Sequence, residues 1–302
     1  AGNLFTLYLF YEIVSIATYP LVMHHQDAEG YEGGKKYIVY LFFTSKAFLL
    51  TGMVLLYMQC NTLDFDASGI VSGILPEGAN RTLVTVTYLM FLFGFAKSGI
   101  MPLHNWLPSA MVAPTPVSAL LHAVVVVKVG VFSTSRVMLS IFGTQLLHDT
   151  GLGLFTAYFV SFTILTASII ALTKSNLKAR LAYSTVSQLS YVLLGVAMLT
   201  PNGVTGGLIH ISNHAFSKIT LFFCAGCIFV ASGKKDIKEL GGLGYRMPFT
   251  MVAFALASLS MIGVPPVCGF VSKWYLLLGS MDLHNWILLT VLLASSLLNA
   301  GY

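Results

Sequence analysis

The sequence contains few charged residues and no segment long enough to form a soluble domain. Only 9% of the 302 residues are charged, whereas about a quarter of the residues are charged in an ordinary soluble domain. Hydrophobic residues make up 56% of the chain, and its mean hydropathy is +0.82. This composition excludes a soluble globular protein and indicates a membrane protein embedded in a lipid bilayer.

The sequence also lacks the motifs that hold redox cofactors and metals. No G-x-G-x-x-G follows a predicted strand, and no cysteine cluster suits an iron–sulfur centre. Cys224 and Cys227 form a single C-x-x-C inside an apolar run, which we interpret as packing rather than as a metal or redox site. We therefore expect no cofactor, no metal, and no catalytic residue for a redox or hydrolytic reaction of its own.

Long apolar runs fill the chain instead. A membrane span needs about 20 apolar residues, and the runs predict about nine spans. Their approximate ranges are 4–23, 37–57, 83–103, 116–138, 152–172, 183–200, 206–230, 248–279 and 286–302. No linker rich in proline, glycine or serine divides them, so we expect one all-α polytopic transmembrane domain over residues 1–302. The chain starts directly before an apolar run and stops inside one, which predicts a core fragment of a longer protein.

Basic residues in the loops predict the orientation in the membrane, because short cytoplasmic loops hold the excess of lysine and arginine. If the spans alternate in direction, one side collects Lys35, Lys36, Lys174, Lys178, Arg180, Lys234, Lys235, Lys238 and Arg246, and the other side only Arg81 and Arg136. The first helix would therefore enter the cell membrane, or an inner membrane, from the outside. The formal net charge of +5 reflects this bias, so we expect no nucleic-acid partner.

Ionisable residues also occur within the predicted spans. These are the acid Glu12 and five lysines, Lys46, Lys97, Lys128, Lys218 and Lys273. Each charge costs roughly 2.5–3.5 kcal/mol in a bilayer, about 15 kcal/mol together, which a merely structural bundle would not retain. Lysine suits a proton relay because an amine in a low-dielectric site can release its proton near neutral pH. For Lys46 the alternative is that its long stem carries the ammonium to the headgroups.

Prolines interrupt two of the predicted spans beside a lysine. The stretch "FAKSGIMPLHNWLPSAMVAPTP" follows Lys97 with four prolines, and "MIGVPPVCGFVSKWY" places Pro265 and Pro266 just before Lys273. Proline removes a backbone donor, so the freed carbonyls must lie in a bundle interior or a polar cavity. One broken span in each half predicts an inverted-repeat transporter with its site near the membrane midplane. The alternative is an ordinary proline kink beside an unrelated lysine.

A polar stripe crosses the span over 206–230. In "HISNHAFSK", His210, His214 and Lys218 recur every four residues, which places them on one face of a helix. We expect this face to point into the protein. Polar residues in the preceding span would form interhelical hydrogen bonds or line a water path, namely Ser184, Ser187, Gln188 and Tyr191.

Four segments carry a resemblance to a known family. "AKSGIMPLHNWLPSAMVAPTPVSALLHAVVVVKVGVF", "LKARLAYSTVSQLSYVLLG", "HISNHAFSKITLFFCAG" and "GVPPVCGFVSKW" resemble the antiporter-like subunits of respiratory complex I, membrane-bound hydrogenases and Mrp-type cation/proton antiporters. "LPSAMVAPTPVSALLHA" and "GFVSKW" look most like the D-type component of the Mrp antiporters. The resemblance implies two inverted five-helix repeats, with residues up to about 140 completing the first and about 150–302 forming the second.

The resemblance also implies roles for individual residues. Glu12 and Lys97 match a glutamate and a broken-helix lysine that form a salt bridge in the family. Lys128, beside His122, matches a connecting lysine, and Lys273 matches the terminal lysine at the second break. His210, His214 and Lys218 match the central relay, whose stripe would face a hydrated channel from Lys128 to Lys273. Lys46 departs from the family pattern and is a further candidate for proton transfer.

We therefore predict a proton-translocating membrane subunit that works with other membrane subunits of a respiratory, hydrogenase or Mrp-type complex. Exchange of protons for sodium or potassium stays open. Two alternatives are a solitary secondary solute carrier and a redox subunit that interacts with quinone or haem. The sequence does not say which complex the chain joins, nor whether that complex is an enzyme.

Overall fold

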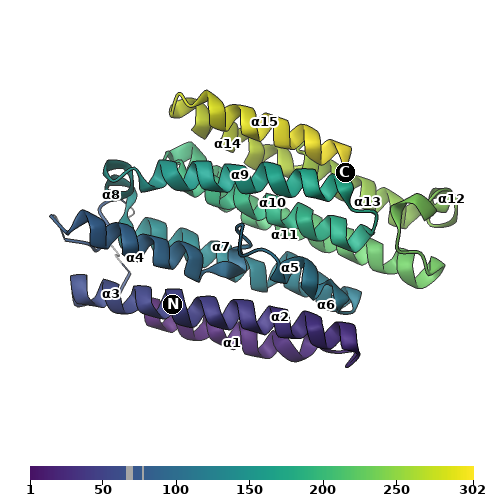
Figure 1. The fold of residues 1–302 in the computed structure, drawn as a ribbon. Coiled ribbons are helices and arrows are strands. Elements are labelled where there is room, and N and C mark those ends of the chain that lie inside the picture. The colour runs from purple at the N-terminus through teal and green to yellow at the C-terminus, as the bar shows by residue number, and fades with distance from the viewer. Residues whose placement is uncertain (66–70, 77) are drawn as a thin grey trace.

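The computed structural model describes residues 1–65, 71–76 and 78–302, and the regular elements in these ranges are helices. Figure 1 shows them as a bundle of roughly aligned rods, with α1 and α2 along one edge and α14 and α15 along the opposite edge. The helices are α1 (Leu4–Val22), α2 (Ala28–Thr44), α3 (Thr51–Cys60), α4 (Arg81–Gly94), α5 (Trp106–Ser109), α6 (Thr115–Ala119), α7 (Val126–Val137), α8 (Thr144–Asp149), α9 (Leu152–Thr173), α10 (Leu177–Ala197), α11 (Pro201–Ser232), α12 (Leu243–Arg246), α13 (Pro248–Ile262), α14 (Cys268–Asp282) and α15 (Trp286–Gly301).

Polar side chains begin several of these helices. Asn3 accepts a hydrogen bond from the Thr6 backbone N–H at 2.7 Å, and Asp27 accepts one from Gly30 at 2.6 Å. Asn176 and Asn285 cap α10 and α15 in the same way. A cap satisfies one of the free N–H groups of the first turn, so it fixes where a helix begins. Apolar residues between these caps then face lipid or neighbouring helices.

Five helical segments are long and apolar enough to cross a membrane. They are Leu4–Val22, Ala28–Cys60, Thr115–Phe142, Leu152–Thr173 and Pro201–Ser232. Three shorter apolar helices are Arg81–Gly94, Pro248–Ile262 and Trp286–Gly301. The all-α membrane architecture expected from the sequence is therefore confirmed, whereas the helix lengths do not by themselves establish the predicted number of spans.

Both predicted interruptions are present. Helix α4 ends at Gly94, and the chain passes through a single 3-10 turn, Ala96–Ser98, before α5 begins at Trp106. Helix α13 ends at Ile262, and α14 begins at Cys268 after Pro265 and Pro266. Pro265 and Pro266 explain why α13 does not continue into α14, because proline cannot donate the backbone hydrogen bond that continues a helix. The first break begins before Pro102, and Gly99, with φ +73°, ends its 3-10 turn.

Three π-helical turns interrupt the other helices, at Ser45–Leu50, Leu120–Val124 and Met138–Phe142. The first contains Lys46 and the second contains His122. Such turns widen the helix locally and occur often at functional sites. Two of the candidate residues thus lie where the regular backbone pattern is broken.

Candidate functional site

Lys97 lies at the first interruption, in the 3-10 turn that follows α4, and its side chain is completely buried. Helix α7 packs closely on this turn at Gly130, where an added Cβ would lie 2.3 Å from the Lys97 carbonyl carbon. The Trp106 indole N–H donates to the Ala96 carbonyl at 3.0 Å. The neighbouring helices therefore fix the backbone that carries this lysine.

The Lys97 ammonium is held by Tyr11 of α1. Its Nζ donates to the Tyr11 backbone carbonyl and lies 3.5 Å from the centre of the Tyr11 ring. The Tyr11 hydroxyl oxygen accepts from the Lys97 backbone N–H at 3.3 Å. These contacts offer the lysine a carbonyl dipole and a ring face, but no full negative charge.

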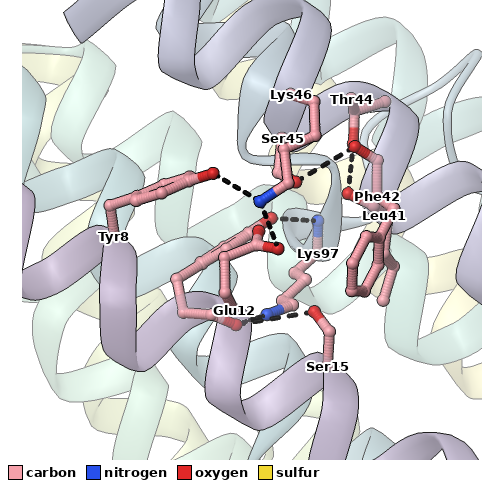
Figure 2. Close-up of polar contacts among 10 residues, drawn as sticks. Tyr8, Glu12, Ser15, Leu41, Phe42, Thr44, Ser45, Lys46 and Lys97 are labelled. Atoms are coloured by element: carbon pink, nitrogen blue, oxygen red, sulfur yellow. Dashed lines mark hydrogen bonds and ion pairs between the residues drawn. The ribbon is translucent and has the colours of Figure 1, made fainter.

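Glu12, next to Tyr11, pairs with Lys46. The Lys46 Nζ lies 3.0 Å from Glu12 Oε2 and donates to the Tyr8 hydroxyl at 2.6 Å (Figure 2). The salt bridge expected between Glu12 and Lys97 is therefore not formed in this structure. Tyr8 and Glu12 lie one helical turn apart and face Lys46, whereas the Tyr11 carbonyl faces Lys97. In this structure the Lys46 ammonium contacts Glu12 and Tyr8 of α1.

Lys128 and His214 form the central contact between the two halves of the chain. Lys128 on α7 and His214 on α11 are both buried, and Lys128 Nζ lies 2.6 Å from His214 Nδ1. Their positions are 86 residues apart in the sequence. Packing of α7 and α11 therefore places a base from one half in hydrogen-bond contact with a base from the other.

His210 continues this row toward the second interruption. Its Nδ1 lies 2.9 Å from the Ser272 hydroxyl on α14, and its Nε2 lies 2.9 Å from Gln188 Oε1 on α10. The His210 ring centre lies 6.2 Å from that of His214 and 5.6 Å from that of Tyr191. All of these side chains are buried.

Lys273 ends the row beside the second interruption. Its Nζ donates to the Ile262 carbonyl at 2.9 Å and to the Ser296 hydroxyl at 3.3 Å. It also lies 5.1 Å from the centre of the Tyr191 ring. Ile262 is the last residue of α13, so the ammonium satisfies a carbonyl that the broken helix leaves free and lies at the negative end of the helix dipole.

Lys218 and His122 lie beside this row. The Lys218 Nζ donates to the Ser184 hydroxyl at 2.6 Å and to the Leu181 carbonyl at 3.3 Å, both on α10. His122 is completely buried, 5.5 Å from the Phe222 ring, and neither of its nitrogens has a hydrogen-bond partner among the described residues. The structure thus confirms that the polar stripe of α11 points inward, with His210 and His214 in the row and Lys218 against α10.

Comparison with known proteins identifies the family. The family profile described as "NADH:quinone oxidoreductase/Mrp antiporter, TM" matches residues 1–299. The chain belongs to this family. Over 310 residues it is 36% identical to NADH-quinone oxidoreductase subunit N of Desulforudis audaxviator, a match that covers 100% of this chain and 59% of that protein. The chain therefore spans about three fifths of this relative.

Solved structures of multi-subunit complexes contain the same fold. One is the membrane-bound sulfane sulfur reductase, an archaeal respiratory membrane complex, with a TM-score of 0.89, 29% identity, and coverage of 100% of this chain and 61% of that chain. Another is the Mrp complex from Dietzia sp. DQ12-45-1b, with a TM-score of 0.88, 26% identity, and coverage of 99% and 55%. The resemblance inferred from the sequence is thus confirmed for this member of the antiporter family.

Several contact residues of this family member were not predicted from its sequence. Tyr8 and Tyr11 hold Lys46 and Lys97 in the first half, and Ser272 and Ser296 hold His210 and Lys273 in the second. The tyrosines could have been found, because they lie one turn before Glu12 and directly beside it. In the described part of the chain, no group of three or more His, Cys, Asp or Glu side chains is placed to share a metal ion.

Proposed function

We propose that this chain is the proton-translocating core of a membrane subunit, and that protons move between the two interrupted helices along buried basic side chains. The observation that supports this best is the row Lys128, His214, His210, Tyr191 and Lys273, in which successive groups from α7, α11, α10 and α14 are buried and adjacent. Lys97 lies against α7 close to its start. A row of titratable groups across a bundle is the arrangement expected of a proton relay.

Each step of this relay has chemistry suited to proton transfer. The 2.6 Å contact of Lys128 and His214 allows a proton to pass directly from the ammonium to the imidazole. Imidazole can take a proton on one nitrogen and release it from the other, so His214 and His210 can pass it onward. The rings are too far apart for a direct hydrogen bond, and Gln188, Ser272 or water would bridge this step.

Buried polar atoms without a hydrogen-bond partner along the row support a role for water in proton transfer. Within the described residues, His214 Nε2, Gln188 Nε2 and the Tyr191 hydroxyl are buried without a hydrogen-bond partner. Buried polar groups of this kind are normally satisfied, often by ordered water. Water molecules beside these atoms would satisfy them and connect His214 to Lys273.

The two interruptions support an inverted-repeat arrangement within one domain. Residues up to about 140 contain α4 and its break beside Lys97, and about 150–302 contain the break between α13 and α14 beside Lys273. Counting each broken helix as one span would support the nine spans expected from the sequence. The bias of lysine and arginine supports a cytoplasmic side for the first part of α2 around Lys35 and for the connections around Lys174 and Lys235, with α1 entering from the outside.

The chain would work as one subunit of a larger membrane complex that supplies or receives the energy. The similar proteins support this, since one is named as a subunit of a quinone oxidoreductase and two others are parts of solved complexes. The transported ion is the proton. Exchange for sodium or potassium finds less support, because the buried ionisable groups of the row are bases rather than the oxygen ligands that such cations require.

Replacement of Lys128 tests this proposal. Lys128→Met keeps the stem volume but cannot carry a proton, so proton uptake by the reconstituted full-length complex should fall more than about tenfold. Lys128→Arg should also fail, since a guanidinium with a pKa above about 12 does not release its proton. Uptake is measured in proteoliposomes and normalised to assembled complex on a native gel.

Lys238→Met, in the exposed 3-10 turn Ile237–Glu239, is the matched control and should keep normal uptake. A Lys128→Arg complex that assembles and pumps normally would contradict the relay, because it would show that only the positive charge matters.

A further inference from the structure

Around Glu12 the structure brings together one acid and two lysines, Lys97 and Lys46, and the proposed relay gives no role to Lys46. We propose that Lys46 is a positioning residue of the proton path, which competes with Lys97 for the Glu12 carboxylate and so sets when Lys97 holds or releases its proton. This inference rests on the proposed function and deepens it.

The present contacts show one of the two pairings. Glu12 Oε2 is taken by Lys46 at 3.0 Å, while Lys97 is left with the Tyr11 carbonyl and ring. In the view of Figure 2 the Glu12 carboxylate lies between the two lysine side chains. An ammonium buried among neutral acceptors is poorly stabilised, so this pairing favours release of the Lys97 proton toward Lys128.

The carboxylate has a second oxygen available for the other pairing. Glu12 Oε1 is buried and has no hydrogen-bond partner among the described residues. Such an atom is costly unless some state of the protein satisfies it. Rotation of the Glu12 side chain toward Lys97 would satisfy a carboxylate oxygen and hold the proton on Lys97, while Lys46 would keep its contact with Tyr8.

The position of Lys46 excludes an incidental surface contact. It lies 18 positions after Ala28 and 14 before Cys60 in one continuous helical segment, about 27 and 21 Å from the two ends. A lysine at this depth needs a partner, because a charge near the bilayer centre is costly. Its side chain is 49% exposed, against 10% for Glu12, so it can leave the carboxylate without entering the core while the Tyr8 hydroxyl remains its partner.

The other ionisable groups nearby already have partners or lie further along the path. Tyr37 on α2 is bonded to Thr18, Tyr88 on α4 to Thr156, and Lys128 on α7 to His214, while Tyr191 on α10 lies beside His210. Tyr8 binds Lys46, and Tyr11 binds Lys97. Among the described residues, Glu12 is the one buried acid. The two lysines therefore have no second buried carboxylate to share.

The pH dependence of proton uptake tests the competition in the full-length complex. In Lys46→Met, Glu12 pairs with Lys97 alone and holds its proton, so release requires a higher pH. We expect the pH profile of uptake to move upward by about one unit, which is a tenfold change in the proton equilibrium. Uptake at pH 7 should fall by about the same factor. Lys46→Arg keeps a charge for Glu12 and should restore the wild-type profile.

A double variant tests whether the effect of Lys46 depends on Glu12. In a Glu12→Gln background, Lys46→Met should not move the profile further, because the two lysines then have nothing to share. Lys36→Met, on the exposed first part of α2, is the control and should leave the profile unchanged.

The outcomes separate this inference from the proposed function. An assembled Lys46→Met complex with the wild-type profile, or a shift that persists without Glu12, would overturn the role of Lys46. If Lys128→Met is inactive in the same assay, the relay stands and only the competition fails. If Lys128→Met is fully active, the proposed function itself fails.

Discussion

At the first interruption, Lys97 binds a carbonyl of a helix remote in sequence, α1, whereas at the second, Lys273 on α14 binds the last carbonyl of the adjacent segment α13. The second contact closes a local break and depends on residues only 11 positions apart. The first depends on the packing of α1, 86 positions away. Each half thus contains a buried lysine at a broken helix, and the two lysines are held by different neighbours.

The two regions also differ in charge. Among the described residues, Glu12 is the one buried acid, and it lies in the first half with Lys46 and Lys97. Lys273 has instead the Ile262 carbonyl, the Ser296 hydroxyl and the Tyr191 ring. A carboxylate changes the proton affinity of a neighbour far more than a hydroxyl does. We therefore expect the first half to be where proton release is regulated and the second to be a simpler end of the path.

We expect the largest effect from substitutions of the lysines at the two ends of the proton path. Lys97→Met and Lys273→Met should each reduce proton uptake by the assembled complex more than about tenfold, because the altered end could then no longer carry a proton. Assembly should be retained, since each change removes a buried charge that is costly to insert. Proton uptake in proteoliposomes and native gels measure both quantities. Normal uptake by either assembled variant would remove that lysine from the path.

Replacement of Glu12, the buried acid, tests whether the first half differs from the second. Glu12→Gln leaves Lys46 without its ion-pair partner in the middle of a span, so assembly should fall and the uptake of assembled complex should drop several-fold. Ser296→Ala is the matched change in the second half and removes one hydrogen bond to Lys273, worth about 1.5–3 kcal/mol. Quantitative native gels and uptake assays compare the two. Equal effects would show that the acid gives the first half no special role.

A smaller effect tests the packing around Lys97. Gly130→Ala would bring a Cβ to 2.3 Å from the backbone of the Lys97 turn, which must shift. Overpacking of this kind typically costs about 1–3 kcal/mol, so the unfolding temperature of the purified complex should fall by several degrees. Gly241→Ala is the control, because its added Cβ has no atom within 4 Å. An unchanged unfolding temperature for Gly130→Ala would show that the turn yields easily.

Many features of this site could be predicted from the sequence. Apolar runs predict the helices, prolines predict both breaks, and the four-residue spacing of His210, His214 and Lys218 predicts one inward face. The structure places each of these features as expected because they follow from local chemistry: helix periodicity, the missing proline donor and the cost of exposing charge to lipid. The number of spans stays a prediction, since each part of a broken helix is shorter than a membrane is thick.

The partner of Glu12 could not be predicted in the same way. The sequence places Glu12, Lys46 and Lys97 within spans, but the choice between the lysines depends on how α1, α2 and α4 are rotated against one another. Lys46 is 34 positions from Glu12, and Lys97 contacts Tyr11 across 86 positions. Periodicity fixes which residues share a face of one helix, whereas only tertiary packing fixes which neighbour that face meets. The sequence thus determined that charges are buried here, and the packing of helices decided how they pair.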